Sequence, residues 1–264
     1  MAEWTEKQVL ITVRTYPVPS AKDIEVSCTA AITLSGDWIR LFPVRYRFLK
    51  RDKRFRKYDL VNIRLKRASD GRPESYNPDP DSIEIISHVG PGKNWAERRK
   101  IILRSKASSI CWLQNELASN PKAATLGIFK PANIKRLIIE PDDPHWTPDQ
   151  LAKLKQAEQA NMFGSEPNPP ELEKIPYKFS YKYTCGAPDC KDHTMLCTDW
   201  EMGEAYRSWR TKYGPQGWEA KFRQRFETEM KSKFDTHFYV GTVHEYPNSW
   251  IIVGLFYPPL IPAN

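Results

Sequence analysis

The chain has 264 residues, of which 40% are hydrophobic and 12% aromatic, and it carries a formal net charge of +8. This apolar content can form a folded core and argues against a mainly disordered chain. No apolar run approaches the roughly 20 residues that a membrane-spanning helix needs, and the first residues lack a signal-peptide pattern. We therefore expect a cytoplasmic protein that does not enter a membrane.

The first 92 residues contain five short apolar segments that predict β-strands separated by turns. The segments are Gln8–Tyr16, Val26–Leu34, Trp38–Phe42, Leu60–Lys66 and Ser82–His88. Five strands in so short a stretch predict a small antiparallel barrel or curled sheet, by analogy with OB or PUA domains. We expect residues 1–92 to form one β-rich domain.

Residues 93–163 have the pattern of a helical connecting region. The spacing of Asn94 and Glu97 predicts a capping box at the start of one helix. Thr147 and Gln150 predict the start of another, with a proline between them at the first helical position.

The segment Gly164–Pro176 holds four prolines in thirteen residues and predicts a linker. Residues 177–264 then predict a C-terminal domain of strands and helices, which makes the whole chain α+β. One of its helices has large apolar residues at steps of four, as a core-facing helix does. They are Trp218, Phe222, Phe226 and Met230.

Positive charge is concentrated in one window of the N-terminal domain. Between Arg40 and Arg72 there are thirteen Lys and Arg against three Asp, a net charge of +10, so the rest of the chain sums to about −2. A basic excess confined in this way predicts a patch that meets a polyanion, and nucleic acid is the expected partner.

Aromatic residues alternate with the cations of this window, and aromatic faces stack on unpaired bases. The alternative is a solvated basic loop whose aromatic rings turn into the core. The residues that we expect to contact DNA or RNA are Arg45, Arg47, Arg51, Arg54, Arg56, Lys57, Arg72 and Tyr76.

Three of the five cysteines and one histidine fall within thirteen residues, as Cys185, Cys190, His193 and Cys197. Thiolates and imidazole are the ligands of structural Zn²⁺, so this cluster predicts a zinc site. In ligand set and size it is similar to a CCHC zinc knuckle, but the gaps are four, two and three residues, where the knuckle has two, four and four. A turn without metal, or a catalytic zinc with three ligands, remains an alternative.

Three carboxylates follow directly, at Asp199, Glu201 and Glu204. Together with His193 they are candidates for catalysis, because carboxylates beside a histidine can bind Mg²⁺ for phosphodiester cleavage or support N-glycosidic cleavage. The alternative is purely structural, since acidic residues at a helix N-terminus are favoured by capping and by the helix dipole.

No motif for binding nucleoside triphosphates or dinucleotides occurs, so we expect no nucleotide cofactor. The sequence predicts a nucleic-acid-binding protein that acts hydrolytically, as a nuclease or a base-excising glycosylase. A non-catalytic module that recognises modified or structured nucleic acid is the alternative, and a protein-interaction subunit is a weaker one.

Overall fold

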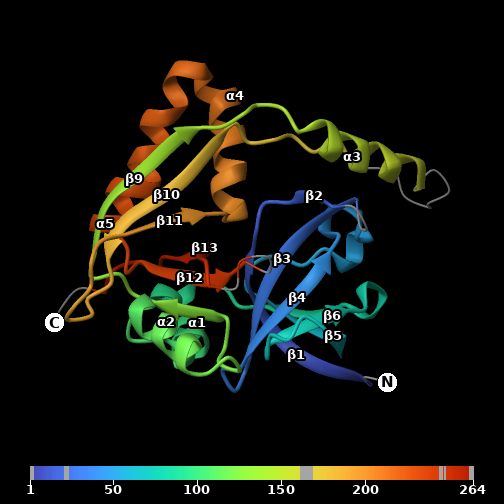
Figure 1. The fold of residues 1–264 in the computed structure, drawn as a ribbon, viewed down its shortest axis with the longest axis horizontal. Helices are drawn as coiled ribbons and strands as arrows, with labels where there is room; N and C mark the ends of the chain where they lie inside the picture. The colour runs from blue at the N-terminus through green and yellow to red at the C-terminus, as the bar shows by residue number, and fades with distance from the viewer. Residues whose placement is uncertain (1–2, 21–23, 161–168, 244–245, 247, 262–264) are drawn as a thin grey trace.

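The computed structural model describes residues 3–20, 24–160, 169–243, 246 and 248–261. It consists of an N-terminal five-stranded closed β-barrel, several helices, and a C-terminal β-sheet with helices packed on it (Figure 1). The α+β class expected from the sequence is therefore confirmed.

Five strands close the barrel because the first of them pairs on both sides. Around the barrel they are β1 (Trp4–Arg14), β3 (Ile24–Thr33), β4 (Trp38–Val44), β6 (Ser75–Pro78) and β5 (Asp59–Arg67), and β5 pairs with β1. Two further strands extend the sheet outside the closed part, β2 (Val18–Ser20) on β3 and β7 (Glu84–His88) on β5. Strand β6, which completes the barrel, was not expected, whereas the expected fifth strand corresponds to β7.

Strand β1 is buried on both faces, which places it where the two halves of the protein meet. Val9 and Ile11 belong to the core inside the barrel. Leu10 and Val13 point the other way, into a core that they share with Val253 of the C-terminal sheet. Alternation of side chains separates Leu10 from Val9 and Ile11, and the register shift between Ile11 and Val13 places Val13 on the same side as Leu10.

Helices α1 (Gly92–Ile102) and α2 (Ile110–Ser119) follow the barrel. The capping box expected at Asn94 is not formed, because Lys93, Asn94 and Trp95 have positive φ and the regular helix begins only after them. Helix α2 is capped by Ser109, whose Oγ accepts a hydrogen bond from the Trp112 N–H at 3.0 Å.

The C-terminal sheet has six strands. In spatial order they are β8 (Leu126–Phe129), β12 (His237–Thr242), β13 (Trp250–Phe256), β11 (His193–Cys197), β10 (Tyr177–Thr184) and β9 (Asn133–Pro141). Strands β9 and β10 pair along their length although the predicted linker lies between them in sequence. That segment therefore does not separate two sheets, and residues 164–168 of it lie outside the described residues.

Helix α3 (Pro148–Ala160) belongs to the excursion between β9 and β10, and its predicted start is confirmed. The Thr147 Oγ1 accepts from the Gln150 N–H, and the Gln150 Oε1 accepts from the Thr147 N–H. This reciprocal pair is the capping box read from the sequence.

Helix α4 (Trp200–Arg223) continues through a π-helical turn, Gln224–Glu229, into α5 (Met230–Ser232). A break at Gly214 divides α4, since this glycine has φ +74° and a proline follows it. The apolar stripe expected here is confirmed, and its Phe222 ring stacks on Phe179 of β10 with centroids 4.5 Å apart. Among the described residues, no helix is long and apolar enough to cross a membrane.

Candidate functional site

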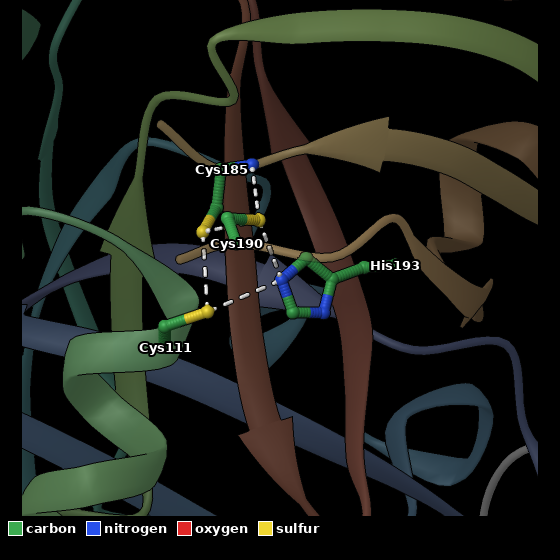
Figure 2. A group of neighbouring side chains, drawn as sticks. All are labelled: Cys111, Cys185, Cys190 and His193. Carbon is green, nitrogen blue, oxygen red and sulfur yellow. Dashed lines mark hydrogen bonds between the residues drawn. The ribbon is translucent and has the colours of Figure 1, made fainter. Parts of the chain in front are cut away.

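Four potential metal ligands meet at one end of the C-terminal sheet (Figure 2). The thiols of Cys111, Cys185 and Cys190 and the imidazole of His193 have ligand atoms that all lie within 4.8 Å of one another. The His193 Nε2 is 3.4 Å from the Cys111 Sγ and 3.2 Å from the Cys190 Sγ. Such a group could hold a metal ion, and its three sulfurs and one nitrogen are a donor set that suits zinc.

The fold brings these ligands together from two places in the sequence. Cys185 directly follows β10, His193 begins β11, and Cys190 lies in the turn between the strands. Gly186 has φ +85°, a left-handed conformation that lets the turn fold back beside Cys185. Cys111 lies in the first turn of α2, which the Ser109 cap holds in place.

The cysteines of this group differ in acidity. Burial works to raise the pKa of Cys185, but hydrogen bonds from the backbone and from the neighbouring thiols lower it to about 6. Burial and the adjacent Cys185 raise the pKa of Cys111 to about 12. The contacts within the group thus favour the thiolate form of Cys185 without a bound cation.

Cys111 takes the place that the sequence analysis assigned to Cys197. Cys197 is buried in β11, where it pairs with Phe179 on one side and Ile252 on the other. Burial and the charge of Asp199 raise the pKa of its thiol, as expected of a core residue. Sequence spacing could not identify Cys111, because 74 residues separate it from Cys185.

A second site lies between the barrel and the C-terminal sheet, where a cavity of about 410 Å³ opens. Aromatic side chains and charged groups both line it. The aromatic residues are Phe55, Tyr58, Trp95, Trp200 and Tyr257. The charged or titratable residues are Arg14, Arg56, Lys57, His88, Arg98, Asp199 and Glu201.

Asp199 is buried at the bottom of this site and both of its carboxylate oxygens are occupied. Its Oδ1 accepts from the Glu201 N–H as the cap of α4, and its Oδ2 accepts from the Leu255 N–H, each at 2.7 Å. Burial raises the pKa of Asp199 to about 6, and the charge of Lys57 opposes this only in part. Asp199 therefore joins α4 to β13.

Glu201 forms an ion pair with Lys57 across the interface between barrel and sheet. Its Oε2 accepts from the Lys57 Nζ at 2.9 Å and from the Tyr257 hydroxyl at 3.1 Å. Burial works against ionisation, but the Lys57 ammonium outweighs it and lowers the pKa of Glu201. Burial likewise works to lower the pKa of Lys57, and Glu201 holds it well above its usual value.

Three of the four residues expected to act together in catalysis divide between two sites. Asp199 and Glu201 line the cavity, whereas His193 belongs to the cysteine cluster. Glu204 lies outside both groups and accepts from the Arg207 guanidinium at 3.1 and 3.2 Å. The sequence grouped Glu201 with Glu204, whereas the structure places Glu201 with Asp199 at the cavity and Glu204 outside it.

Two arginines of the cavity each lie against two aromatic rings, and sequence reasoning missed both. The Arg14 guanidinium lies 3.5 Å from the Tyr46 ring centroid and 3.9 Å from that of Trp200. Arg98 lies in the same way, 3.9 Å from the Tyr58 ring and 4.5 Å from Trp95. Burial lowers the pKa of each arginine.

His88 is a further residue of the cavity that the sequence did not single out. Its Nδ1 lies 2.7 Å from the Oδ1 of buried Asp59, and its Nε2 lies 3.3 Å from Arg98 Nη2. Since Arg98 can only donate, Nε2 is the accepting nitrogen and Nδ1 carries the proton shared with Asp59. No sequence signal marked His88, because Asp59 and Arg98 come from other elements.

Backbone strain and unpartnered polar atoms occur at this cavity. Tyr58 and Trp95 have φ of 70° and 64°, a region that bulky residues rarely adopt. The Arg14 Nε and the Tyr58 hydroxyl are buried and have no hydrogen-bond partner among the described residues. Strained backbone and free buried donors are both typical of a binding site.

The basic loop, residues 45–58, contributes its last four residues to the lining of this cavity. Arg56 and Lys57 line it, and Arg56 is 73% exposed at its side chain. Arg45 and Arg51 are exposed, whereas Arg54 donates to the Leu49 carbonyl. Arg47 donates to the Pro170 carbonyl and pairs with Glu25 at 3.4 Å. Two of the loop aromatics, Phe55 and Tyr58, turn inward and are buried.

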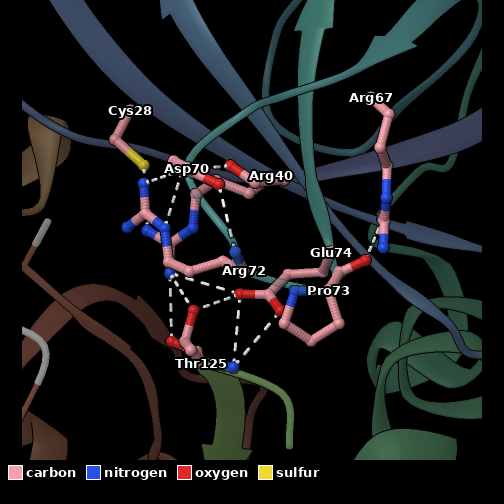
Figure 3. A network of polar contacts seen from close by, with 9 residues as sticks. Cys28, Arg40, Arg67, Asp70, Arg72, Pro73, Glu74 and Thr125 are labelled. Atoms are coloured by element: carbon pink, nitrogen blue, oxygen red, sulfur yellow. Dashed lines mark hydrogen bonds and ion pairs between the residues drawn. The ribbon is translucent and has the colours of Figure 1, made fainter. Parts of the chain in front are cut away.

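Arg72 and Tyr76 lie away from the cavity, Arg72 in a loop held by polar contacts (Figure 3) and Tyr76 in strand β6. Arg72 pairs with Asp70, and the Tyr76 ring carries the Arg67 guanidinium 5.0 Å from its centroid. Beside them a buried network joins the barrel to the residue before β8. In this network Arg40 Nη2 donates to the Thr125 carbonyl at 3.0 Å and forms an ion pair with Glu74. The Glu74 carboxylate also accepts from the N–H and the hydroxyl of Thr125.

Comparison with known proteins covers both halves of the chain. The family model described as a domain of unknown function (DUF8757) matches residues 105–264, and a second, also described as a domain of unknown function (DUF8758), matches residues 5–104. The chain belongs to the first of these families, whose model spans more than half of it. No curated protein matches the chain.

Proposed function

Starting from this family membership, we propose that the protein is a nucleic-acid-processing enzyme that takes one nucleotide into the cavity between barrel and sheet. The observation that carries the proposal is that aromatic rings, cations and an ionised carboxylate surround one cavity of about 410 Å³. This volume falls within the range of small-ligand sites.

The composition of the cavity fits a nucleotide better than a neutral ligand. Four cations, Arg14, Arg56, Lys57 and Arg98, outnumber the two carboxylates, which favours an anion such as a phosphate. The rings of Trp95 and Trp200 line the cavity with Arg98 and Arg14 against them, and the parts of these rings that face the cavity can contact a base. The basic loop supplies exposed arginines that can follow the strand outside the cavity.

The Lys57–Glu201 pair is the part of the cavity that suits a reaction. It lies where barrel and sheet meet, and both groups are held in their charged forms. Preorganised charges stabilise charge that develops in a transition state. Strand cleavage and release of a base are the two reactions that these groups can support.

The test is to assay binding and reaction separately. Glu201→Gln is expected to abolish strand cleavage or base release while binding of an oligonucleotide stays within about two-fold. Glu204→Gln is the matched control, because Glu204 lies on the same helix outside the cavity. An active Glu201→Gln variant would contradict the proposal.

A second candidate is a module that binds nucleic acid without reacting with it. The two unpartnered donors favour it, because the Arg14 Nε and the Tyr58 hydroxyl suit recognition of a bound base. Binding that requires the cavity, with neither cleavage nor base release from any substrate tried, would select this alternative.

We further propose that Cys111, Cys185, Cys190 and His193 hold Zn²⁺ in a structural role. Four protein ligands complete a tetrahedron and leave no open position for a substrate. The centre would fasten α2 to the β10–β11 turn. Metal analysis of protein purified without chelator tests this.

A further inference from the structure

We propose that the substrate is RNA and that His88, oriented by Asp59, starts strand cleavage by taking a proton from a ribose 2′-hydroxyl. This inference rests on the proposed function, because it assigns the reaction of the same cavity. His88 is not one of the residues that the sequence suggested, and its contacts carry the argument.

The Asp59–His88 pair has the arrangement of a general base. Asp59 is buried, and its Oδ1 lies 2.7 Å from Nδ1, which fixes the ring and the tautomer. The accepting Nε2 faces the cavity side, where Arg98 lies 3.3 Å away. In the free protein Nε2 accepts from Arg98, and the phosphate of a bound RNA, by engaging the Arg98 guanidinium, frees this nitrogen to take the 2′-hydroxyl proton.

Lys57 is the second group that transfers a proton, and it lines the same cavity as His88 and Arg98. The Arg98 guanidinium contacts His88 and lies 3.9 Å from the Tyr58 ring centroid. The Lys57 Nζ, which donates to Glu201, lies 5.6 Å from the same centroid. Arg98 thus lies near both ends of the site, where it can bind the phosphate. Lys57 donates to Glu201 and to the Leu255 carbonyl, so within the described part of the chain its third proton has no hydrogen-bond acceptor, and Asp199 Oδ2 lies 3.8 Å from Nζ.

The reaction balances without a further reactant. The 2′-hydroxyl gives its proton to His88 Nε2 as its oxygen forms a bond to phosphorus, and the bond from phosphorus to the 5′-oxygen breaks. Lys57 gives a proton to the departing 5′-oxygen, while Arg98 neutralises the charge on the phosphoryl oxygens. The products are a 2′,3′-cyclic phosphate and a 5′-hydroxyl, and proton exchange with water restores His88 and Lys57.

The contacts of the carboxylates favour this route over water activated by Mg²⁺. Both oxygens of Asp199 accept backbone N–H groups. The Lys57 ammonium lies 2.9 Å from Glu201 and 3.8 Å from Asp199, in the position that a divalent ion bridging them would need. The ribose itself supplies the nucleophile in RNA, whereas DNA has none.

The experiment compares three oligonucleotides of one sequence, as RNA, as DNA and as 2′-O-methyl RNA, with the full chain. We expect cleavage of RNA alone, with cyclic-phosphate ends and no stimulation by added Mg²⁺. The 2′-O-methyl RNA should bind and stay intact. Cyclic-phosphate ends identify attack by the 2′-oxygen, because water would leave an uncyclised phosphate.

Variants then test the role of each group. His88→Ala is expected to lower kcat by about 10² to 10⁴-fold, with partial rescue by added imidazole, and His145→Ala, an exposed histidine outside the cavity, should act as wild type. Asp59→Asn should lower kcat with KM nearly unchanged, since Asp59 positions His88 and does not touch substrate.

The outcomes separate this inference from the proposed function. Equal cleavage of DNA, release of a free base, or full activity of His88→Ala would overturn the inference and leave an enzyme at the cavity. Binding without any reaction would overturn both. A folded His88→Ala protein, checked by its thermal unfolding, is required for each comparison.

Discussion

The Nζ of Lys57, in the basic loop of the barrel, lies 2.9 Å from the Oε2 of Glu201, in the first turn of helix α4. These residues are 144 positions apart, so their pairing exists only when barrel and C-terminal sheet are docked. Lys57 also donates to the Leu255 carbonyl of β13. The same contact thus joins the two halves of the fold and forms one wall of the candidate site.

Removing the charge of Lys57 is expected to destabilise the protein as well as to inactivate it. Lys57→Met keeps much of the apolar stem but leaves Glu201 without its cation, and breaking a buried pair costs about 3–5 kcal/mol. Because Glu201 is partly exposed, we expect about 1–3 kcal/mol less free energy of unfolding in urea. Double substitution with Glu201→Gln should recover part of this loss, and strictly additive losses would contradict the coupling.

The buried Asp199 predicts a pH dependence of stability. Its pKa is raised to about 6 in the folded state, so folding favours the protonated carboxyl. This contribution is complete below the unfolded pKa of about 4 and is lost as the pH rises through about 6. We expect wild type to lose up to about 3 kcal/mol relative to Asp199→Asn between pH 4 and pH 7. Chemical unfolding of both proteins at several pH values measures this difference. If their free energies of unfolding ran parallel with pH, the prediction would be wrong.

Zinc content should depend on Cys111 and not on Cys197. We expect roughly one zinc per chain in the wild-type protein and less than about 0.2 in Cys111→Ser, because the fourth ligand is lost. Cys197→Ala removes a thiol outside the cluster and should keep its metal. Metal analysis together with thermal unfolding checks this, and loss of zinc from Cys197→Ala would restore the ligand set expected from sequence.

The network around Arg40 should be a large source of stability. Glu74→Gln leaves the buried Arg40 without its carboxylate, and such a change costs about 3–5 kcal/mol. Asp81→Asn breaks the exposed pair with Lys50 and should cost less than about 1 kcal/mol. Urea unfolding of both variants makes the comparison, and equal losses would contradict the assignment.

Binding of nucleic acid should depend on salt and on Arg56. A slope of log affinity against log salt arises from released counterions, and each phosphate contact contributes about one unit. Arg56→Ala is therefore expected to reduce the slope by about 1, whereas Lys122→Ala, exposed and outside the cavity, should leave it unchanged. A slope near zero for the wild-type protein would remove the basis for a nucleic-acid partner.

Local sequence patterns predicted those features whose stabilising contacts join residues close together in the chain. Four of the five barrel strands, the cap formed by Thr147 and Gln150, and the apolar stripe of the helix after Gly214 follow from alternation, capping and helical spacing. Cys185, Cys190 and His193 were predicted as neighbours for the same reason, since one turn holds all three.

Only the tertiary structure decided which distant residues complete each site. Cys111 comes from a helix that precedes the other ligands by more than seventy residues. Cys197 shares a face of β11 with His193 but lies four residues, about 13 Å, further along the strand, in the core. The cavity depends on docking of barrel and sheet, which sets Lys57 against Glu201 and Arg98 against His88. Sequence thus determined the elements and the charge of the loop, whereas packing between elements far apart in the chain determined the chemistry they can perform.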